Sequence, residues 1–183
     1  GSLAYVLSTP KKRSTIALTQ LMFSVGSITL LFLILTLVHI GVNAHSPLDL
    51  TIAGASAGVF GISGDLTAAI IFKINLSALL VCLAMSGVCY MFSGIFNLSK
   101  FSIGFGGAFV GISVLSNMMA MFGSLGVDAL ENFKYLSICT LYDYKSILLE
   151  TDAWVTKGIA ALIVAIVSYT IGAVTFCKKD LPL

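Results

Sequence analysis

The chain has 183 residues, of which 58% are hydrophobic and only 10% are charged, whereas about 25% of the residues of an ordinary soluble domain are charged. This composition excludes a soluble globular protein and indicates a polytopic, all-α integral membrane protein that forms one membrane domain over residues 1–183. The net charge of +2 is too small and too dispersed to indicate a nucleic acid as partner.

The chain opens with a basic cluster that leads into a long apolar run. Lys11, Lys12 and Arg13 precede residues 21–42, which carry no charged side chain. A helix of that length reaches roughly 33 Å, which is enough to cross a bilayer. Basic residues beside a span are retained on the cytoplasmic side. We therefore expect residues 1–13 to be cytoplasmic and a first span over residues 14–42 to lead outward, although basic residues here could also serve only to anchor a helix end to lipid headgroups.

The next apolar segment, residues 51–72, is ambiguous because it contains four glycines and Asp65. If it crosses the membrane, the chain has five spans and its two basic ends lie on opposite sides. If it does not cross, there are four spans and both basic ends lie inside. The positive-inside rule favours four spans. We therefore expect residues 43–75 to be extracytoplasmic, with a re-entrant or interfacial segment at 51–72.

Three further spans are predicted at residues 76–96, 101–122 and 157–176. Between the last two, residues 123–156 alternate apolar and charged side chains at partly helical spacing, which is typical of short amphipathic helices on the outer surface. With this topology, six of the ten basic residues are inside and seven of the eight acidic residues are outside. Both ends of the chain are then cytoplasmic.

The third predicted span carries a stripe of small residues. Gly104, Gly107 and Gly111 lie three and four positions apart, on one side of a helix where another backbone can approach closely. Asn117 is a strong hydrogen-bonding side chain at depth in the same span, and such a group faces protein or a water-filled path. These four residues are candidates for helix packing or for a translocation path.

The sequence offers weak support for an enzyme. Gly54-Ala55-Ser56-Ala57-Gly58 matches the Gly-x-Ser-x-Gly pattern of serine hydrolases, and GASAGVFG resembles the serine-bearing helix start of rhomboid intramembrane proteases. Rhomboids place the catalytic histidine after the serine, but here His39 and His45 both precede Ser56. We expect no catalytic residue. We also expect no metal site and no phosphate-binding loop on this chain, because the four cysteines lack metal-ligand spacing and no glycine-rich run ends in Gly-Lys-Ser/Thr.

The two ends of the chain carry a family resemblance. A Tyr-x-Leu-Ser-x-Pro-x-x-Arg pattern is formed by Tyr5, Leu7, Ser8, Pro10 and Arg13. It resembles the cytoplasmic coupling segment between the second and third membrane helices of type-2 ABC exporter permeases. The ending FCKKDLPL resembles the basic tail of many such permeases. By this resemblance the four spans correspond to the last four of six helices, and the first two helices are missing from this chain.

The resemblance implies a membrane-spanning permease subunit of an ATP-driven exporter. It also implies that this exporter lies in a cell membrane, namely a prokaryotic plasma membrane. Two permease subunits, as a homodimer or heterodimer, would sit on two ABC ATPase subunits that bind ATP and Mg²⁺, while this chain binds no cofactor and contacts lipid. The residues implied in docking to the ATPase are Leu3, Tyr5, Leu7, Ser8, Pro10, Lys11, Lys12 and Arg13. Two alternatives stay open: a non-transporting membrane partner or immunity protein, and a rhomboid-like intramembrane serine protease.

Overall fold

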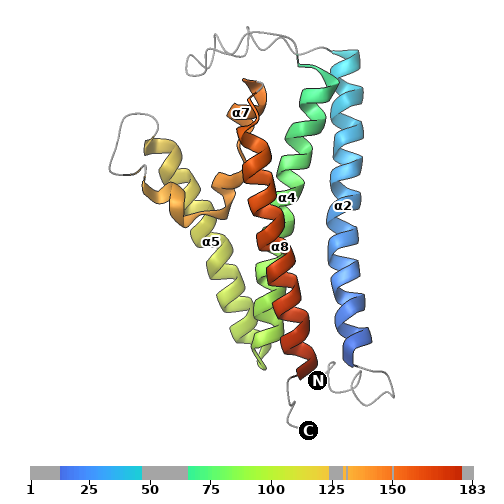
Figure 1. Ribbon diagram of the computed structural model, residues 1–183, viewed down its shortest axis with the longest axis vertical. Coiled ribbons are helices and arrows are strands. Elements are labelled where there is room, and N and C mark those ends of the chain that lie inside the picture. Colours follow the sequence, from blue (N-terminus) through green and yellow to red (C-terminus); the bar gives the residue numbers. More distant parts are fainter. Residues whose placement is uncertain (1–12, 47–65, 124–129, 131, 150, 179–183) are drawn as a thin grey trace.

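The computed structural model describes residues 13–46, 66–123, 130, 132–149 and 151–178. Every element among these residues is helical, which confirms the predicted all-α class. Four long helices, α2 (Arg13–His45), α4 (Ala68–Ile95), α5 (Ser99–Gly123) and α8 (Ala153–Lys178), form the bundle (Figure 1). Each of the four is long and apolar enough to span a membrane. Between α5 and α8 lie η1 (Asn132–Leu136), η2 (Ile138–Leu141) and α7 (Tyr144–Leu148).

Helix α4 begins at Ala68 rather than at the predicted residue 76. Residues 68–72 are therefore the start of a long helix and not the end of the expected outer excursion, whose remaining part, 51–65, lies outside the described residues. Lys73 lies within this helix, near its start. A lysine near a helix end can lay its aliphatic stem along apolar surface and extend its ammonium group toward water, so it does not stop a membrane helix. The other helices begin and end within a few residues of the predicted bounds.

The helices run alternately up and down, so that α2 begins and α8 ends at the same end of the bundle, here named the basal end; the opposite end is the distal end (Figure 1). Helices α4 and α8 pack along each other as a central pair. Helix α2 lies on one side of this pair and α5 on the other. The buried core between the central helices is formed by Val81, Ala84, Ala161, Ala165 and Tyr169.

The backbones of α4 and α8 come closest near the basal end, at Gly94 and Gly172. A Cβ built on Gly172 would lie 2.7 Å from Tyr90 Cδ1 and 3.0 Å from Met91 Cα, and a Cβ on Gly94 would overlap the carbonyl oxygen of Gly172. Neither position has room for a side chain. Membrane helices have little hydrophobic drive to associate, so close backbone approach through small residues is what holds such a pair together.

Helix α5 packs on α4 near the turn that joins them and then diverges from it. Rings stack at the basal end, where the centroids of Phe96 and Phe105 are 4.8 Å apart. Farther along, η1 and η2 lie between α5 and α8 (Figure 1). The Ser137 hydroxyl donates to the Ser113 carbonyl oxygen at 2.6 Å, which ties η2 to α5.

This position differs from the predicted amphipathic helices on the outer surface, because η2 lies about halfway along the long helices. Ile138, Leu141 and Tyr142 pack against the α4–α8 core. Two carbonyl oxygens of this segment have a partner within it: the Thr140 hydroxyl lies 2.7 Å from the carbonyl oxygens of Lys134 and Ser137. Irregular backbone is tolerated at such depth when it is covered by protein.

Candidate functional site

The predicted coupling segment lies almost wholly outside the described residues. This holds for Leu3, Tyr5, Leu7, Ser8, Pro10, Lys11 and Lys12, while Arg13 is the first residue of α2. What the structure describes is the helix that directly follows these residues. Its contacts with the central pair are therefore the part of the predicted site whose geometry is known.

The basal contact of α2 is a hydrogen bond to its backbone. Tyr90 Oη, on α4, donates to the carbonyl oxygen of Ala17 at 2.9 Å, and Ala17 is buried. The Tyr90 ring in turn lies 5.4 Å, centroid to centroid, from the ring of Tyr169 on α8. Beside this contact, α2 and α8 enclose a groove of about 420 Å³ at the basal end. Its lining residues are Ser14, Ala17, Leu18, Leu21, Ala173, Val174, Cys177 and Lys178.

Two helical turns farther along α2, at Ser24, three hydroxyl groups from three helices meet. Ser24 Oγ lies 3.0 Å from Ser86 Oγ and 3.1 Å from Tyr169 Oη, and Tyr169 Oη donates to Ser86 Oγ at 2.9 Å. We name these three residues the hydroxyl cluster. It joins α2 to both central helices by hydrogen bonds inside an otherwise apolar bundle. Because its members are neutral hydroxyls, the cluster offers no general base, and its role is to fix the position of α2.

The distal contact between α2 and α4 is centred on Asn75, which is only 6% exposed. Its side-chain nitrogen lies 3.2 Å from His39 Nδ1 and donates to the Ile71 carbonyl oxygen at 2.9 Å. Nearby, Asn43 Nδ2 donates to the Leu66 carbonyl oxygen at 2.6 Å. The last turn of α2 and the chain just before α4 are thus joined at the distal end.

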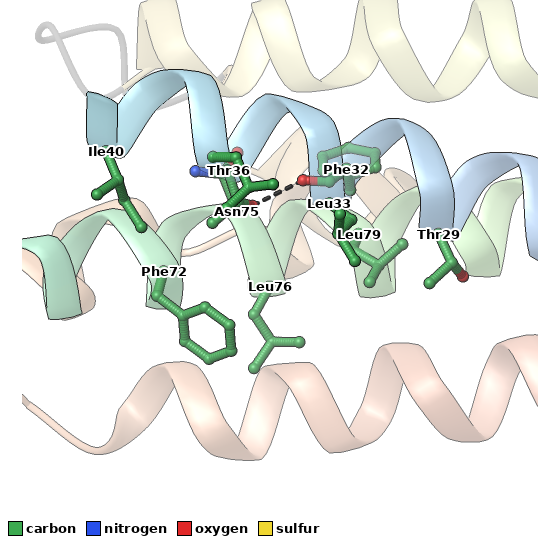
Figure 2. Close-up of a pocket in the computed structure, with 10 residues that line it drawn as sticks. Thr29, Phe32, Leu33, Thr36, Ile40, Phe72, Asn75, Leu76 and Leu79 are labelled. Carbon is green, nitrogen blue, oxygen red and sulfur yellow. Dashed lines mark hydrogen bonds between the residues drawn. The ribbon is translucent and has the colours of Figure 1, made fainter. Parts of the chain in front are cut away.

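Next to Asn75, α2 and α4 form a groove of about 340 Å³ (Figure 2). Figure 2 shows Phe72 and Leu76 extending from α4 and the Thr36 hydroxyl turned back to the Phe32 carbonyl oxygen, to which it donates at 2.7 Å. The Thr36 hydroxyl of the groove is thus hydrogen-bonded within its own helix, and the groove presents a mainly apolar surface. Such a surface suits lipid chains better than a polar ligand.

The predicted glycine stripe lies on a face of α5 that no described part of this chain covers. A Cβ built on Gly104, Gly107 or Gly111 would have nothing within 4 Å, whereas Gly106 lies against Cys89 of α4. Asn117 is partly exposed, and no hydrogen bond joins its side chain to a described residue. Within the described part of the chain, no other helix therefore lies against the three glycines.

The close helix contact lies instead at glycines that the sequence analysis missed. On α4 these are Gly87 and Gly94, and on α8 they are Gly158 and Gly172. A signal was present: the two glycines of α4 are seven positions apart, and those of α8 are separated by fourteen. Small residues repeated every seven positions keep returning to the same face of a helix, as in a coiled-coil seam.

At the distal end, Asp143 joins α7 to α8. Its carboxylate accepts from the Ser146 backbone N–H at 3.2 Å and the Ser146 hydroxyl at 2.7 Å, and it forms a 2.6 Å ion pair with Lys157 Nζ. Partial burial by itself would raise the pKa of Asp143. The hydrogen bonds from Lys157 and Ser146, together with the charge of Lys157, outweigh burial and hold the pKa of this carboxyl below its ordinary value.

The serine of the hydrolase-like motif, Ser56, lies outside the described residues. Within the described part of the chain, no three His, Cys, Asp or Glu side chains are grouped so that they could hold a metal ion. No protein-family model, characterised protein or solved structure matches this chain. The functional assignment therefore rests on the chain's own residues.

Proposed function

We propose that this chain is the membrane-spanning permease subunit of an ATP-driven ABC exporter of the type-2 class. The observation that carries the proposal is the Tyr-x-Leu-Ser-x-Pro-x-x-Arg pattern of residues 5–13 placed directly before the first long helix. A helix-anchoring function alone requires basic residues but not the tyrosine, leucine and proline that accompany them.

The arrangement of the bundle supports the proposal. The basic residues Arg13 and Lys178 are the first residue of α2 and the last residue of α8, and both helix ends lie at the basal end. The positive-inside rule then assigns the basal end to the cytoplasm. A segment that precedes α2 would emerge on this side, where a cytoplasmic ATPase is accessible.

The proposed mechanism is rigid-body coupling. Tyr5, Leu7 and Pro10 would fill an apolar pocket on the ATPase, and Lys11, Lys12 and Arg13 would form its charged rim. ATP and Mg²⁺ belong to the ATPase, and this chain contributes no cofactor. When the ATPases close on ATP, the displacement would pass through the segment into α2.

A second permease subunit is part of the proposal. No described residue of another element covers the glycine-lined face of α5, and Ile103 and Phe105 of the same helix are 74% and 52% exposed. Gly104, Gly107 and Gly111 would let a second subunit approach closely or would line the path between subunits, with Asn117 as a polar contact. The rest of the exposed apolar surface would meet lipid.

The test is capture of the ATPase by the full-length permease with Tyr5→Ala and Leu7→Ala combined. A buried anchor at an interface contributes about 2 kcal/mol or more, which corresponds to a loss of about thirtyfold in affinity. We expect the variant to insert into membranes normally and to lose both ATPase capture and transport. The matched control replaces Leu30 and Leu37 on the exposed side of α2 by alanine and should retain both.

Equal capture by the Tyr5/Leu7 variant and the control would return the segment to the role of a headgroup anchor. Failure of the unaltered full-length protein to capture any ATPase would favour the non-transporting membrane partner. These two outcomes are distinguishable, because equal capture by the variant and the control requires a complex of permease and ATPase, whereas failure of the unaltered protein to capture any ATPase excludes that complex.

A further inference from the structure

Three sulfur-bearing side chains lie along one face of α4. Cys82, Met85 and Cys89 are spaced at i, i+3 and i+7, so they follow one another on the same side of the helix. This is the side turned toward α5 and η2. Cys89 Sγ lies 4.0 Å from the carbonyl oxygen of Gly106 on α5, and Met85 Sδ lies 3.8 Å from Sγ of Cys139 on η2.

Cys139 is held in place by the start of η2. The Ser137 hydroxyl accepts from the backbone N–H of Cys139 at 3.0 Å and donates to the Ser113 carbonyl oxygen at 2.6 Å. Ser137 is buried. The Cys139 thiol is therefore presented to Met85 by a backbone that is fixed to α5, and this preorganisation lowers the cost of binding a ligand there.

Cys82 supplies a third sulfur on the accessible side. It is one helical turn before Met85, on the same face of α4. Because α5 diverges from α4 at this level, Cys82 is exposed, whereas Cys139 is half-buried.

We propose that Cys139, Met85 and Cys82 form a binding site for a soft monovalent metal ion, Cu(I). Thiolate and thioether sulfurs select Cu(I), whereas hard ions need oxygen ligands. With metal–sulfur bonds of about 2.3 Å, two sulfur atoms 3.8 Å apart subtend an angle of about 110° at a shared ion, which suits a three-coordinate or four-coordinate site. Zinc is not favoured, because the described residues bring no three His, Cys, Asp or Glu side chains together.

Binding forms one metal–sulfur bond to each of the three side chains. The two thiols bind as thiolates, so each releases one proton to the medium, and the oxidation state of the metal does not change. The site is independent of the proposed permease function, since it uses no residue of the coupling segment. In the absence of a metal, the same side chains act as polarizable fillers between α4 and η2.

The experiment is an anaerobic titration of the full chain in detergent with Cu(I) and a chromophoric competing chelator, under a non-thiol reductant. The background carries Cys89→Ser and Cys177→Ser, so that all thiol-bound metal reports on the proposed site. We expect one equivalent of Cu(I). Met85→Leu keeps the side-chain volume and should weaken binding by at least about tenfold, since loss of a partner that only supports a ligand already costs that much.

The matched control is Met22→Leu, which removes a thioether from the exposed side of α2 and should leave the affinity unchanged. Cys139→Ser should abolish stoichiometric binding. If that variant fails to fold, protection of Cys82 and Cys139 from maleimide by one equivalent of Ag(I) in the background protein gives the same information. No binding by the background protein, or equal affinities for Met85→Leu and Met22→Leu, would overturn the proposal.

Discussion

The closest contact between helices makes the sharpest prediction about stability. An alanine methyl group at Gly94 would overlap the carbonyl oxygen of Gly172 and would lie within 3.1 Å of that residue's Cα. All of the nearest atoms are backbone atoms, so no side chain can rotate away. Helices α4 and α8 must move apart to accept the methyl group, and overpacking of this kind costs about 1–3 kcal/mol.

Gly26 on α2 provides the matched control, because a Cβ built there would have nothing within 4 Å. Gly26→Ala should be neutral or stabilising, since alanine is favoured over glycine in a helix by about 1 kcal/mol. Because the propensity gain applies at both helical positions, we expect the two variants to differ in free energy of unfolding by the overpacking cost, about 1–3 kcal/mol, with Gly94→Ala the less stable.

The assay is reversible unfolding of the purified chain in mixed micelles, followed by helical circular dichroism as the denaturing detergent is increased. Helix content before unfolding should be equal in both variants. If Gly94→Ala unfolds at the same denaturant fraction as Gly26→Ala, the two central helices do not pack as described. The glycine seam, that is, the close contact of Gly87 and Gly94 on α4 with α8 around Gly172, is then not what holds the bundle together.

Three further predictions follow from other contacts. Tyr169→Phe removes one hydroxyl from the hydroxyl cluster and should lower the free energy of unfolding by about 1 kcal/mol, the scale of hydrogen bonds between membrane helices, in the same micelle assay; an effect above that of a seam variant would contradict it. Asp143 has a lowered pKa, so its ion pair with Lys157 stabilises the fold above the ordinary carboxyl pKa and the contribution is lost as the pH falls through the lower folded value. Asp143→Asn should therefore be less stable than the unaltered chain near pH 6, by less than about 1 kcal/mol because the Lys157 side chain is 43% exposed to solvent screening, and the difference should vanish in acid; a stability difference that widens in acid would contradict the prediction. In a cysteine-free background, a membrane-impermeant maleimide added to intact cells should label a cysteine introduced at Lys145 but not one introduced at Lys178. Labelling of both would contradict the assignment of the basal end to the cytoplasm.

The long helices were predictable because a bilayer imposes a length and a composition that can be read locally. The start of α4 was missed because residues 51–72 were assigned as a single outer segment, whereas the helix begins at Ala68. The position of η2 among the long helices was also missed. An amphipathic pattern reveals that one side of a segment is apolar, but it does not reveal whether that side meets lipid or the protein core, and Ile138 and Leu141 meet the core.

The candidate packing residues show a related difficulty. Gly107 and Gly111 form a compact motif within one helix and were easy to recognise, yet no described residue of another element lies against them. The seam that does form needs Gly94 from one helix and Gly172 from another, and its pairing depends on the relative rotation of both helices. Sequence periodicity could have identified each half, but only three-dimensional packing joins them.

The contacts between α4 and α8 differ in kind from those that join α2 to this pair. Helices α4 and α8 share close contacts at small residues and a buried apolar core. Helix α2 is joined to them at three polar points: Tyr90 with the Ala17 carbonyl, the hydroxyl cluster, and Asn75 with His39. Its Leu21 and Val25 also pack on the core, and its Asn43 bonds to the Leu66 carbonyl oxygen just before α4. Hydrogen bonds between membrane helices contribute about 0.6 kcal/mol each on average, so displacing α2 costs far less than separating the central pair. Under the proposed coupling function, a force applied to the segment before Arg13 should therefore move α2 first, with α4 and α8 as the fixed body against which it moves. Variants at the three polar points should then alter coupling at little cost to stability, and variants at the seam should do the opposite.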